Sequence, residues 1–292
     1  MPINRLGIMG FGEAGKAMAQ SFIAQDPSVV IYAFDKAPTK AMATGAAQLV
    51  QSAAELAQNC DVIFSVVTAD EAVSAAEALS PALTNAHYYL DGNSVSPGTK
   101  RQAAELVAAH GACYCDMAIM APIQPRGHKT PILLSGGGRD FLEPFVKRWD
   151  FSYGWEGEAV GQASIVKMLR SILIKGMECL ISESVTASQA LGLDERILQS
   201  AGKTLGIADM PALADYVMER AATHGRRRAA EMREVAKTLD ELGLSNDMST
   251  AIAIMQDRIA DMALAEACDG TIPQDRAVIA PLMRGAQRSE KR

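Results

Sequence analysis

Residues 5–20 read RLGIMGFGEAGKAMAQ, and this stretch decides the fold class of the first half of the chain. A short apolar run at 5–9 has the length and composition of a buried strand. The string GFGEAG, which fits G-x-G-x-x-G, follows directly and opens a helical pattern that runs to about Gln25. This order of strand, glycine turn and helix is the context in which the motif holds the pyrophosphate of a dinucleotide.

Each part of the motif has a physical task. Gly10 permits the tight turn, Gly12 lets a phosphate approach the backbone, and Gly15 allows the helix to pack closely on the strand. The helix N-terminus supplies N–H groups and a positive dipole end for the phosphates. The residues predicted to hold the cofactor here are Gly10, Phe11, Gly12, Glu13, Ala14 and Gly15.

A carboxylate follows the second predicted strand. Asp35 lies 20 residues after Gly15, where it is expected to bond the ribose 2′-hydroxyl. A 2′-phosphate would be repelled there, so the sequence favours NAD over NADP. Lys36 next to it keeps NADP open.

The pattern of elements divides the chain into two parts. Up to about residue 160, apolar strand-like runs alternate with helical patterns, which indicates a doubly wound parallel sheet of Rossmann type. From residue 161 onward only helical periodicity appears. The sequence therefore predicts an α/β plus all-α protein, with an NAD(P)-binding domain at 1–160 and a helical domain at 161–292, for which the family resemblance described below implies substrate binding and dimerisation. The helices expected in the second part are 161–191, 194–205, 210–223, 225–243, 247–268 and 273–284.

Composition limits the class of protein. Of the 292 residues 49% are hydrophobic and 21% charged, which is typical of a globular protein with a large core. The net charge of −6 argues against nucleic acid as a partner. With neither a signal peptide nor an apolar run long enough for a membrane, the chain is expected to be cytoplasmic, with its five cysteines as reduced thiols.

The segment GQASIVKMLRSILIKGMECLISES at 161–184 carries a polar stripe at helical spacing. Apolar residues cover its other sides, which predicts a helix buried in a core. A thin cationic stripe on such a helix is expected to face an anionic or reactive group. The members of the stripe are Ser164, Lys167, Ser171, Lys175, Glu178 and Ser182.

Read over its whole length, the chain resembles the superfamily of β-hydroxyacid and 6-phosphogluconate dehydrogenases, which includes 3-hydroxyisobutyrate dehydrogenase. Four segments carry the resemblance, and they occur in the family's order. They are GFGEAGKAMA at 10–19, SVVTADEAV at 65–73, DGNSVSP at 91–97 and GQASIVKMLRS at 161–171.

The resemblance implies roles for residues beyond the glycine turn. Val67 and Thr68 match loop positions beside the nicotinamide, and Asn93 and Ser94 match a loop that meets cofactor or substrate. Lys167 falls on the family's catalytic lysine. A lysine moves the hydroxyl proton during hydride transfer if its pKa is brought toward neutrality, which burial and neighbouring cations both favour.

Three departures from the family pattern fall on substrate recognition. Met120 and Ala121 stand where the family has Ser-Gly, which suggests a larger or less polar substrate group. Arg170 and Ser171 replace an Asn pair, and Glu231-Met232 replaces a Lys-Asp pair. Arg170 would grip a carboxylate or form an ion pair. Ser171 would bond the reacting oxygen or its own i−4 carbonyl, and Lys175 would line the deeper cleft or be structural.

Two basic segments have open roles. His224 and Arg226–Arg228 form either a solvated helix face or an anion-binding element, and 126–129 (RGHK) is expected to be exposed or to act as a lid. None of the histidines has neighbours with metal-ligand spacing, so no metal is expected.

These patterns predict an NAD(P)-dependent oxidoreductase that acts on a β-hydroxy acid or its keto or semialdehyde form. Oxidative decarboxylation of a sugar acid, imine reduction, and a non-catalytic NAD(P)-binding protein are the alternatives. The expected partners are a small acidic substrate and a second copy of the chain, because members of the superfamily pair through the helical domain.

Overall fold

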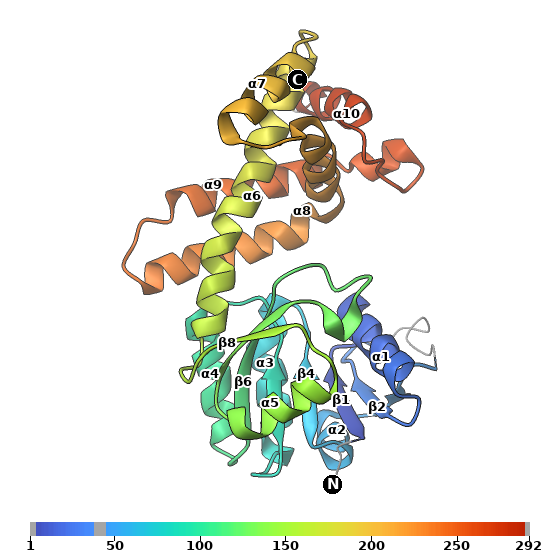
Figure 1. Cartoon of the computed structure of the whole chain (residues 1–292), viewed down its shortest axis with the longest axis vertical. Helices are drawn as coiled ribbons and strands as arrows, with labels where there is room; N and C mark the ends of the chain where they lie inside the picture. Colours follow the sequence, from blue (N-terminus) through green and yellow to red (C-terminus); the bar gives the residue numbers. More distant parts are fainter. Residues whose placement is uncertain (1–3, 38–44, 290–292) are drawn as a thin grey trace. The chain divides into compact units, whose positions relative to one another are not determined.

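A computed structural model describes residues 4–37 and 45–289 of the chain, which forms two compact units, residues 1–168 and 169–292 (Figure 1). The first contains a sheet and the helices that flank it, together with the start of a long helix. The second is entirely helical. The domain boundary at 160/161 stays a prediction.

The first unit is built on one eight-stranded sheet in the order β3-β2-β1-β4-β5-β6-β7-β8. Because β1 has β2 on one side and β4 on the other, the strand order reverses between β1 and β4. The crevice at the carboxyl ends of strands beside such a reversal is where open α/β sheets bind ligands. The strands are β1 Arg5–Met9, β2 Val30–Phe34, β3 Gln48–Leu49, β4 Val62–Ser65, β5 Tyr88–Asp91, β6 Cys113–Ile119, β7 Ile132–Gly136 and β8 Tyr153–Gly157.

The predicted Rossmann-type sheet is confirmed, with one exception to its parallel order. β7 runs antiparallel to β6, with Ile119 opposite Ile132. The 12-residue connection between them contains only the short helix η4 (Gly127–Lys129) and no crossover helix, so the chain turns back beside β6.

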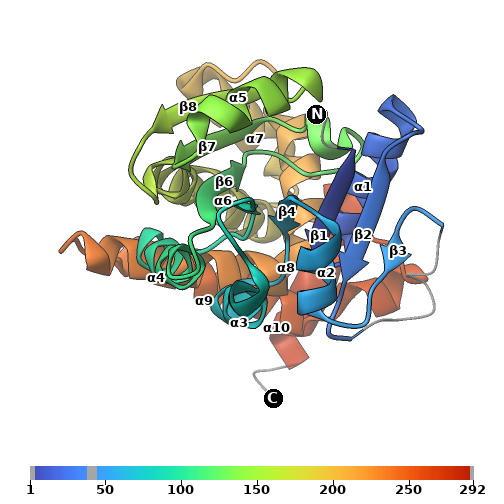
Figure 2. The ribbon, with the colours of Figure 1, turned by 90° about the horizontal axis from the view of Figure 1, so that it is seen from below.

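Helices cover both faces of the sheet, which Figure 2 shows from the end of the unit. α1 and α5 pack on one face over a core that includes Phe22, Phe64 and Phe145. α2, α3 and α4 pack on the other, over a core that includes Leu56, Leu79 and Val107. Their bounds are α1 Glu13–Gln25, α2 Ala53–Asn59, α3 Ala72–Leu79, α4 Pro97–Ala108 and α5 Arg139–Arg148, with short helices η2 Ala69–Glu71 and η3 Ser80–Ala82.

Local sequence fixes where α4 begins. Ser96 is its N-cap, with the hydroxyl oxygen accepting the Thr99 N–H, and Pro97 follows at the first helical position. The first turn of α4 is therefore placed directly after β5 and its loop, which brings Lys100 back toward the strand end.

In the described residues, the second unit contains most of α6, four further α-helices and one short helix, η5. Its core includes Val185, Leu198, Met218, Ile259 and Ile279, one from each of the five helices. The bounds are α6 Gln162–Gln189, α7 Asp194–Leu205, α8 Met210–Glu241, α9 Asp247–Asp261, η5 Leu264–Cys268 and α10 Arg276–Ser289.

Two helix boundaries differ from the sequence prediction. The two helices expected at 210–223 and 225–243 are one helix, α8, which is kinked at His224 with φ −122° and ψ 15°. The helix expected over 247–268 ends at Asp261, because Ala263 adopts a left-handed φ of 47° and the chain continues as η5.

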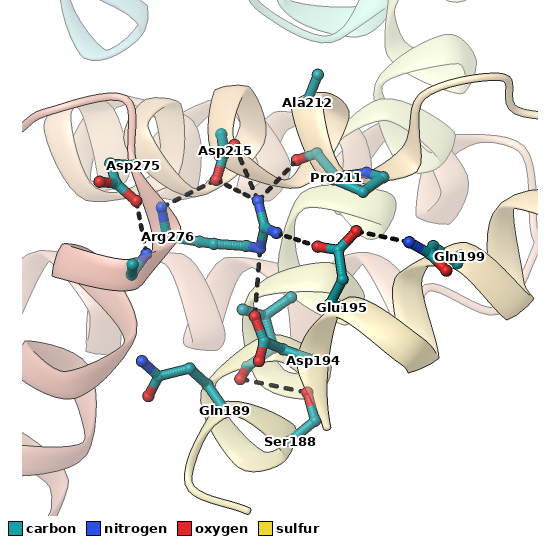
Figure 3. A network of polar contacts seen from close by, with 12 residues as sticks. Ser188, Gln189, Asp194, Glu195, Gln199, Pro211, Ala212, Asp215, Asp275 and Arg276 are labelled. Atoms are coloured by element: carbon teal, nitrogen blue, oxygen red, sulfur yellow. Dashed lines mark hydrogen bonds and ion pairs between the residues drawn. The ribbon is translucent and has the colours of Figure 1, made fainter. Parts of the chain in front are cut away.

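An ion network closes one end of this unit (Figure 3). The Arg276 guanidinium at the start of α10 donates to both oxygens of Asp215 in α8, at 2.9 Å each. It also pairs with Glu195 in α7 at 2.6 Å. With its side chain largely buried, Arg276 ties the N-termini of two helices to α8, which is a structural task.

The burial of α6 differs from the prediction on one apolar face, whereas Lys175 of the polar stripe faces a carboxylate, Glu231, as expected. Leu173 and Leu180, seven residues apart on one face, are 70% and 64% exposed, whereas the polar residues Ser171, Lys175 and Glu178 are buried. Lys175 and Glu178 of the stripe form ion pairs inside the helical unit, and the face that carries Leu173 and Leu180 is the uncovered one. None of the described helices is long and apolar enough to cross a membrane.

Candidate active site

The turn between β1 and α1 has the geometry that a phosphate-binding loop needs. Gly10 has φ +91°, and a Cβ there would lie 2.8 Å from the Val66 carbonyl oxygen. A Cβ on Gly15 would lie 2.3 Å from the Gly10 carbonyl oxygen, so only glycine fits. Gly12 is different, because a Cβ there would meet nothing within 4 Å. Gly12 therefore faces open space at the N-terminus of α1, as an approaching pyrophosphate requires.

Asp35 is fixed beside this turn. Its carboxylate accepts the Phe11 N–H at 2.8 Å and the Ala37 N–H at 2.9 Å. Phe11 itself is fully buried in the core, so it anchors the turn through packing as well. The half-buried carboxylate keeps oxygen lone pairs for a ribose hydroxyl, and the residues present fit a dinucleotide.

The loops after β4 and β5 continue the site along the carboxyl edge of the sheet. Val66 and Val67 lie against Gly10. The Asn93 Oδ1 accepts the Val67 N–H at 2.7 Å, and its Nδ2 donates to Ser65 Oγ at 3.0 Å. Asn93 is nearly fully buried, so in this structure its amide joins the two loops.

Lys167 lies at the same edge, within the first unit. Its Nζ donates a hydrogen bond to Ser94 Oγ at 2.5 Å. Contacts therefore run from Gly10 to Val67 and from Val67 to Asn93, which directly precedes Ser94. A half-buried ammonium and a half-buried hydroxyl are thus brought together beside the glycine turn.

Two side chains of the sheet hold the first turn of α6, one turn before Lys167. Asp116 accepts the Ser164 N–H at 2.9 Å and the Ser164 hydroxyl at 2.7 Å. Ser135 Oγ accepts the Ala163 N–H at 3.0 Å. N–H groups at a helix N-terminus lack intrahelical partners, and here the sheet supplies them.

Sequence reasoning missed a buried group of charges behind this pair. Lys100, Asp91 and Asp116 are all fully buried. Burial alone would lower the pKa of Lys100, but Asp91 and Asp116 outweigh it and hold this pKa above its ordinary value. The available signal was a carboxylate in each of two apolar strands, YYLD at 88–91 and CYCDMAI at 113–119, because a buried carboxylate needs a partner.

The remaining predicted residues of the first unit lie along the same edge. Thr68 is exposed at the start of η2. Met120 and Ala121 directly follow β6, and both are half-buried. Because β6 is parallel to β5, its carboxyl end is at the edge that carries Ser94.

Three predicted residues belong to the helical unit. Lys175 Nζ pairs with Glu231 at 2.8 Å and donates to Ser171 Oγ at 3.2 Å. Lys175 and Ser171 are buried, and Glu231 is half-buried. Arg170 is exposed. Lys175 is thus part of the α6–α8 packing, matched with the carboxylate at 231.

The basic segments also have structural partners. Arg228 donates to both oxygens of the buried Glu178, at 2.6 and 2.5 Å, and Arg226 pairs with Asp257 and Asp261. His128, expected to be exposed, is fully buried and stacks on Phe22 with ring centroids 4.2 Å apart.

Comparisons with known proteins agree with this geometry. Residues 5–143 match the NAD binding domain of 6-phosphogluconate dehydrogenase, and residues 188–259 match a domain of unknown function. A solved structure of a conserved hypothetical protein from Sinorhizobium meliloti is 31% identical, with a TM-score of 0.73 over 98% of this chain and 97% of that one. The chain belongs to the β-hydroxyacid dehydrogenase superfamily.

Within this superfamily, relatives with a named activity match a smaller share of the chain or match it at lower identity. A probable 3-hydroxyisobutyrate dehydrogenase-like protein of Arabidopsis thaliana is 33% identical over 65% of this chain, which spans 62% of that protein. Mycobacterium tuberculosis 3-hydroxyisobutyrate dehydrogenase has a TM-score of 0.70 over 97% of this chain at 17% identity, which shows a shared fold. For this superfamily member the predicted fold and an NAD(P)-binding domain are confirmed.

Proposed function

We propose that this chain is an NAD(P)-dependent oxidoreductase that transfers a hydride between the nicotinamide and a β-hydroxy acid, or its keto or semialdehyde form. The observation that carries the proposal is the hydrogen bond from Lys167 Nζ to Ser94 Oγ, at the sheet edge that also carries the glycine turn. When bound, the cofactor supplies the hydride acceptor or donor. The proton of the substrate hydroxyl needs a separate partner.

Lys167 is the residue that we assign to this proton. As a neutral amine it takes the hydroxyl proton during oxidation, and as an ammonium it polarises and then protonates the carbonyl oxygen during reduction. Ser94 accepts a hydrogen bond from Lys167, so its own O–H remains available to donate to the substrate oxygen. Asn93 keeps the loop that carries Ser94 joined to the loop after β4.

The assigned cofactor is NAD. The Asp35 carboxylate would be repelled by a 2′-phosphate, and Lys36, the cation that kept NADP open, is paired with Glu71 in this structure. A matched ammonium attracts a phosphate less strongly than an unmatched one.

The substrate group that reaches Met120 is proposed to be larger or less polar than a plain hydroxy acid. The thioether of Met120 stands where the superfamily pattern places a serine hydroxyl, and Ala121 adds a methyl group where the pattern has glycine, so one polar contact to a small carboxylate is lost. The same loss favours an imine substrate as the second candidate.

A spectrophotometric screen tests the proposal. Small hydroxy acids, aryl-substituted hydroxy acids and cyclic imines are each offered with NAD(H) and NADP(H), and the nicotinamide absorbance is followed. Turnover of hydroxy acids, with aryl acids preferred over the smallest, is the expected result. Turnover of imines alone would select the second candidate, and NADH binding without any turnover would support a non-catalytic protein.

The chain is also proposed to act as a homodimer. Leu173, Ile174 and Leu180 form an exposed apolar face on α6, which we name the α6 apolar face. Isolated exposed leucines are ordinary, but a continuous apolar face on a long helix indicates an interaction surface. Because members of the superfamily that this chain resembles pair through the helical domain, we propose that a second copy of the chain covers the α6 apolar face.

A further inference from the structure

One buried ammonium joins the two carboxylates that organise the candidate site. Lys100 Nζ lies 3.0 Å from Asp91 Oδ1 and 3.3 Å from Asp116 Oδ1, and it donates to the Asp91 carbonyl oxygen at 2.6 Å. All three side chains have no exposed surface. Lys100 is therefore shielded from solvent and has no route to contact a substrate.

Asp91 organises the Ser94 side of the pair. Its Oδ1 accepts the Asn93 N–H at 2.9 Å, directly before Ser94 in the chain. Its Oδ2 accepts the Tyr114 hydroxyl at 2.6 Å. The carboxylate thus fixes the turn of backbone that presents Asn93 and Ser94.

Asp116 organises the Lys167 side. It binds both the backbone N–H and the hydroxyl of Ser164, and it accepts the Ser135 hydroxyl at 3.3 Å. Ser164 lies three residues before Lys167, so the two share one face of α6. A shift at Ser164 therefore moves the lysine with it.

We propose that Lys100 is a positioning residue that sets the separation of Ser94 and Lys167 by holding Asp91 and Asp116 to one ammonium. Without this cation two carboxylates would be buried together, and like charges repel strongly in such surroundings. The loop after β5 and the first turn of α6 would then separate. The inference rests on the proposed function for its catalytic meaning, but not for its geometry.

The test compares Lys100→Met with a milder variant, Ser164→Ala, which removes one hydroxyl from Asp116 and keeps the buried ions. Two control variants reproduce the loss of a positive charge and the loss of stability that Lys100→Met also causes. Lys147→Met removes one charge from an exposed i,i+4 pair of the same unit, and Leu142→Ala destabilises the core beneath α5 without touching the site. Every variant is checked for its melting temperature and its NADH affinity.

The primary readout does not depend on activity. Lysines are labelled with a trace of acetic anhydride across a range of pH, and mass spectrometry gives the labelling of Lys167 relative to the exposed Lys203. We expect Lys100→Met to change this ratio and its pH dependence, and Ser164→Ala to change both in the same direction by less. Both controls are expected to keep the profile of the unaltered chain.

In an active enzyme, Lys100→Met is also expected to lower kcat by about 100-fold, the cost of a misplaced catalytic group, while NADH affinity stays within about threefold. An unchanged Lys167 labelling profile in a folded Lys100→Met or Ser164→Ala variant would overturn the inference and leave Lys100 a purely structural residue. Failure of the proposed function gives a different result, in which no substrate is turned over although the labelling changes as expected.

Discussion

The Nζ of Lys167 and the Oγ of Ser94 are joined by a hydrogen bond, although 73 residues separate them in the chain. One residue comes from the loop after β5 and the other from the second turn of α6. Both neighbouring segments are held by buried carboxylates, Asp91 and Asp116. The fold of the first unit therefore brings Lys167 and Ser94 together.

Gly12→Ala is expected to leave the fold intact and weaken dinucleotide binding. The added methyl group meets no protein atom within 4 Å, so it occupies the space that a phosphate would enter. We expect NADH affinity to fall by about 1–3 kcal/mol, roughly 5- to 150-fold, with an unchanged melting temperature. Fluorescence titration with NADH measures this. Gly285→Ala in α10, which also meets no atom within 4 Å, is the control. Equal affinities for both variants would contradict a phosphate site at this turn.

Asp35→Ser is expected to reverse the choice of cofactor. Loss of the carboxylate removes a charged acceptor for the ribose and removes the repulsion of a 2′-phosphate. NADH binding should weaken by about 1.5–3 kcal/mol, and NADPH binding should strengthen. Parallel titrations with both cofactors give the ratio. Wild-type protein that binds NADPH as tightly as NADH would show that Asp35 does not select the cofactor.

His128 is expected to make stability depend on pH. Its Nε2 donates to the Trp149 carbonyl oxygen at 2.8 Å, and its buried Nδ1 has no hydrogen-bond partner in the described structure. Burial lowers the pKa of His128 from 6.5 to about 4. The unfolded chain therefore binds a proton first as pH falls. The contribution of the neutral His128 side chain to the free energy of unfolding is fully present above pH 6.5. It is lost as the pH falls from 6.5 to 4, by up to about 3 kcal/mol.

Urea unfolding of wild type and His128→Phe between pH 4 and pH 7 tests whether stability falls with pH as predicted. The variant keeps an aromatic ring stacked on Phe22 but has no titrating group at position 128. It should be less stable at neutral pH, where it lacks the hydrogen bond to Trp149, and the difference should shrink as pH falls to 4. A difference that stays constant with pH would exclude His128 as the titrating group.

The α6 apolar face is expected to hold two copies of the chain together. Leu173→Glu and Leu180→Glu place a charge on it and should yield monomers in sedimentation velocity, whereas wild type is expected to sediment as a dimer. Leu205→Glu, at an exposed position of α7, is the matched control and should leave the dimer intact. Monomeric wild type at micromolar concentration would refute the proposed dimer.

How much the sequence predicts depends on whether a feature is local. The glycine turn and Asp35 follow from spacing along one βαβ unit, and the structure places them together at the carboxyl ends of β1 and β2. The reversed direction of β7 could not be read from its residues, because strand direction depends on the path of the connection before it. The kink at His224 was visible only as a boundary between two helical patterns.

The buried charges show more clearly which contacts cannot be predicted from the sequence. The polar stripe of α6 was recognised by its spacing, but the partners of Lys175 and Glu178 lie 56 and 50 residues away, at Glu231 and Arg228. Spacing predicts which face a residue occupies, and not what covers that face. For the same reason Lys100 looked like an ordinary helix residue, although it neutralises two strand carboxylates.

The central claim concerns the proton that accompanies hydride transfer, and Lys167→Ala tests it most directly. With a substrate identified by the screen, kcat and NADH affinity are measured for this variant and for Lys203→Ala, a control at an exposed position. The account predicts that Lys167→Ala lowers kcat by about 100- to 10,000-fold. It also predicts that NADH affinity stays within about threefold, and that the control is unaffected. Turnover by Lys167→Ala at close to the wild-type rate would contradict the account.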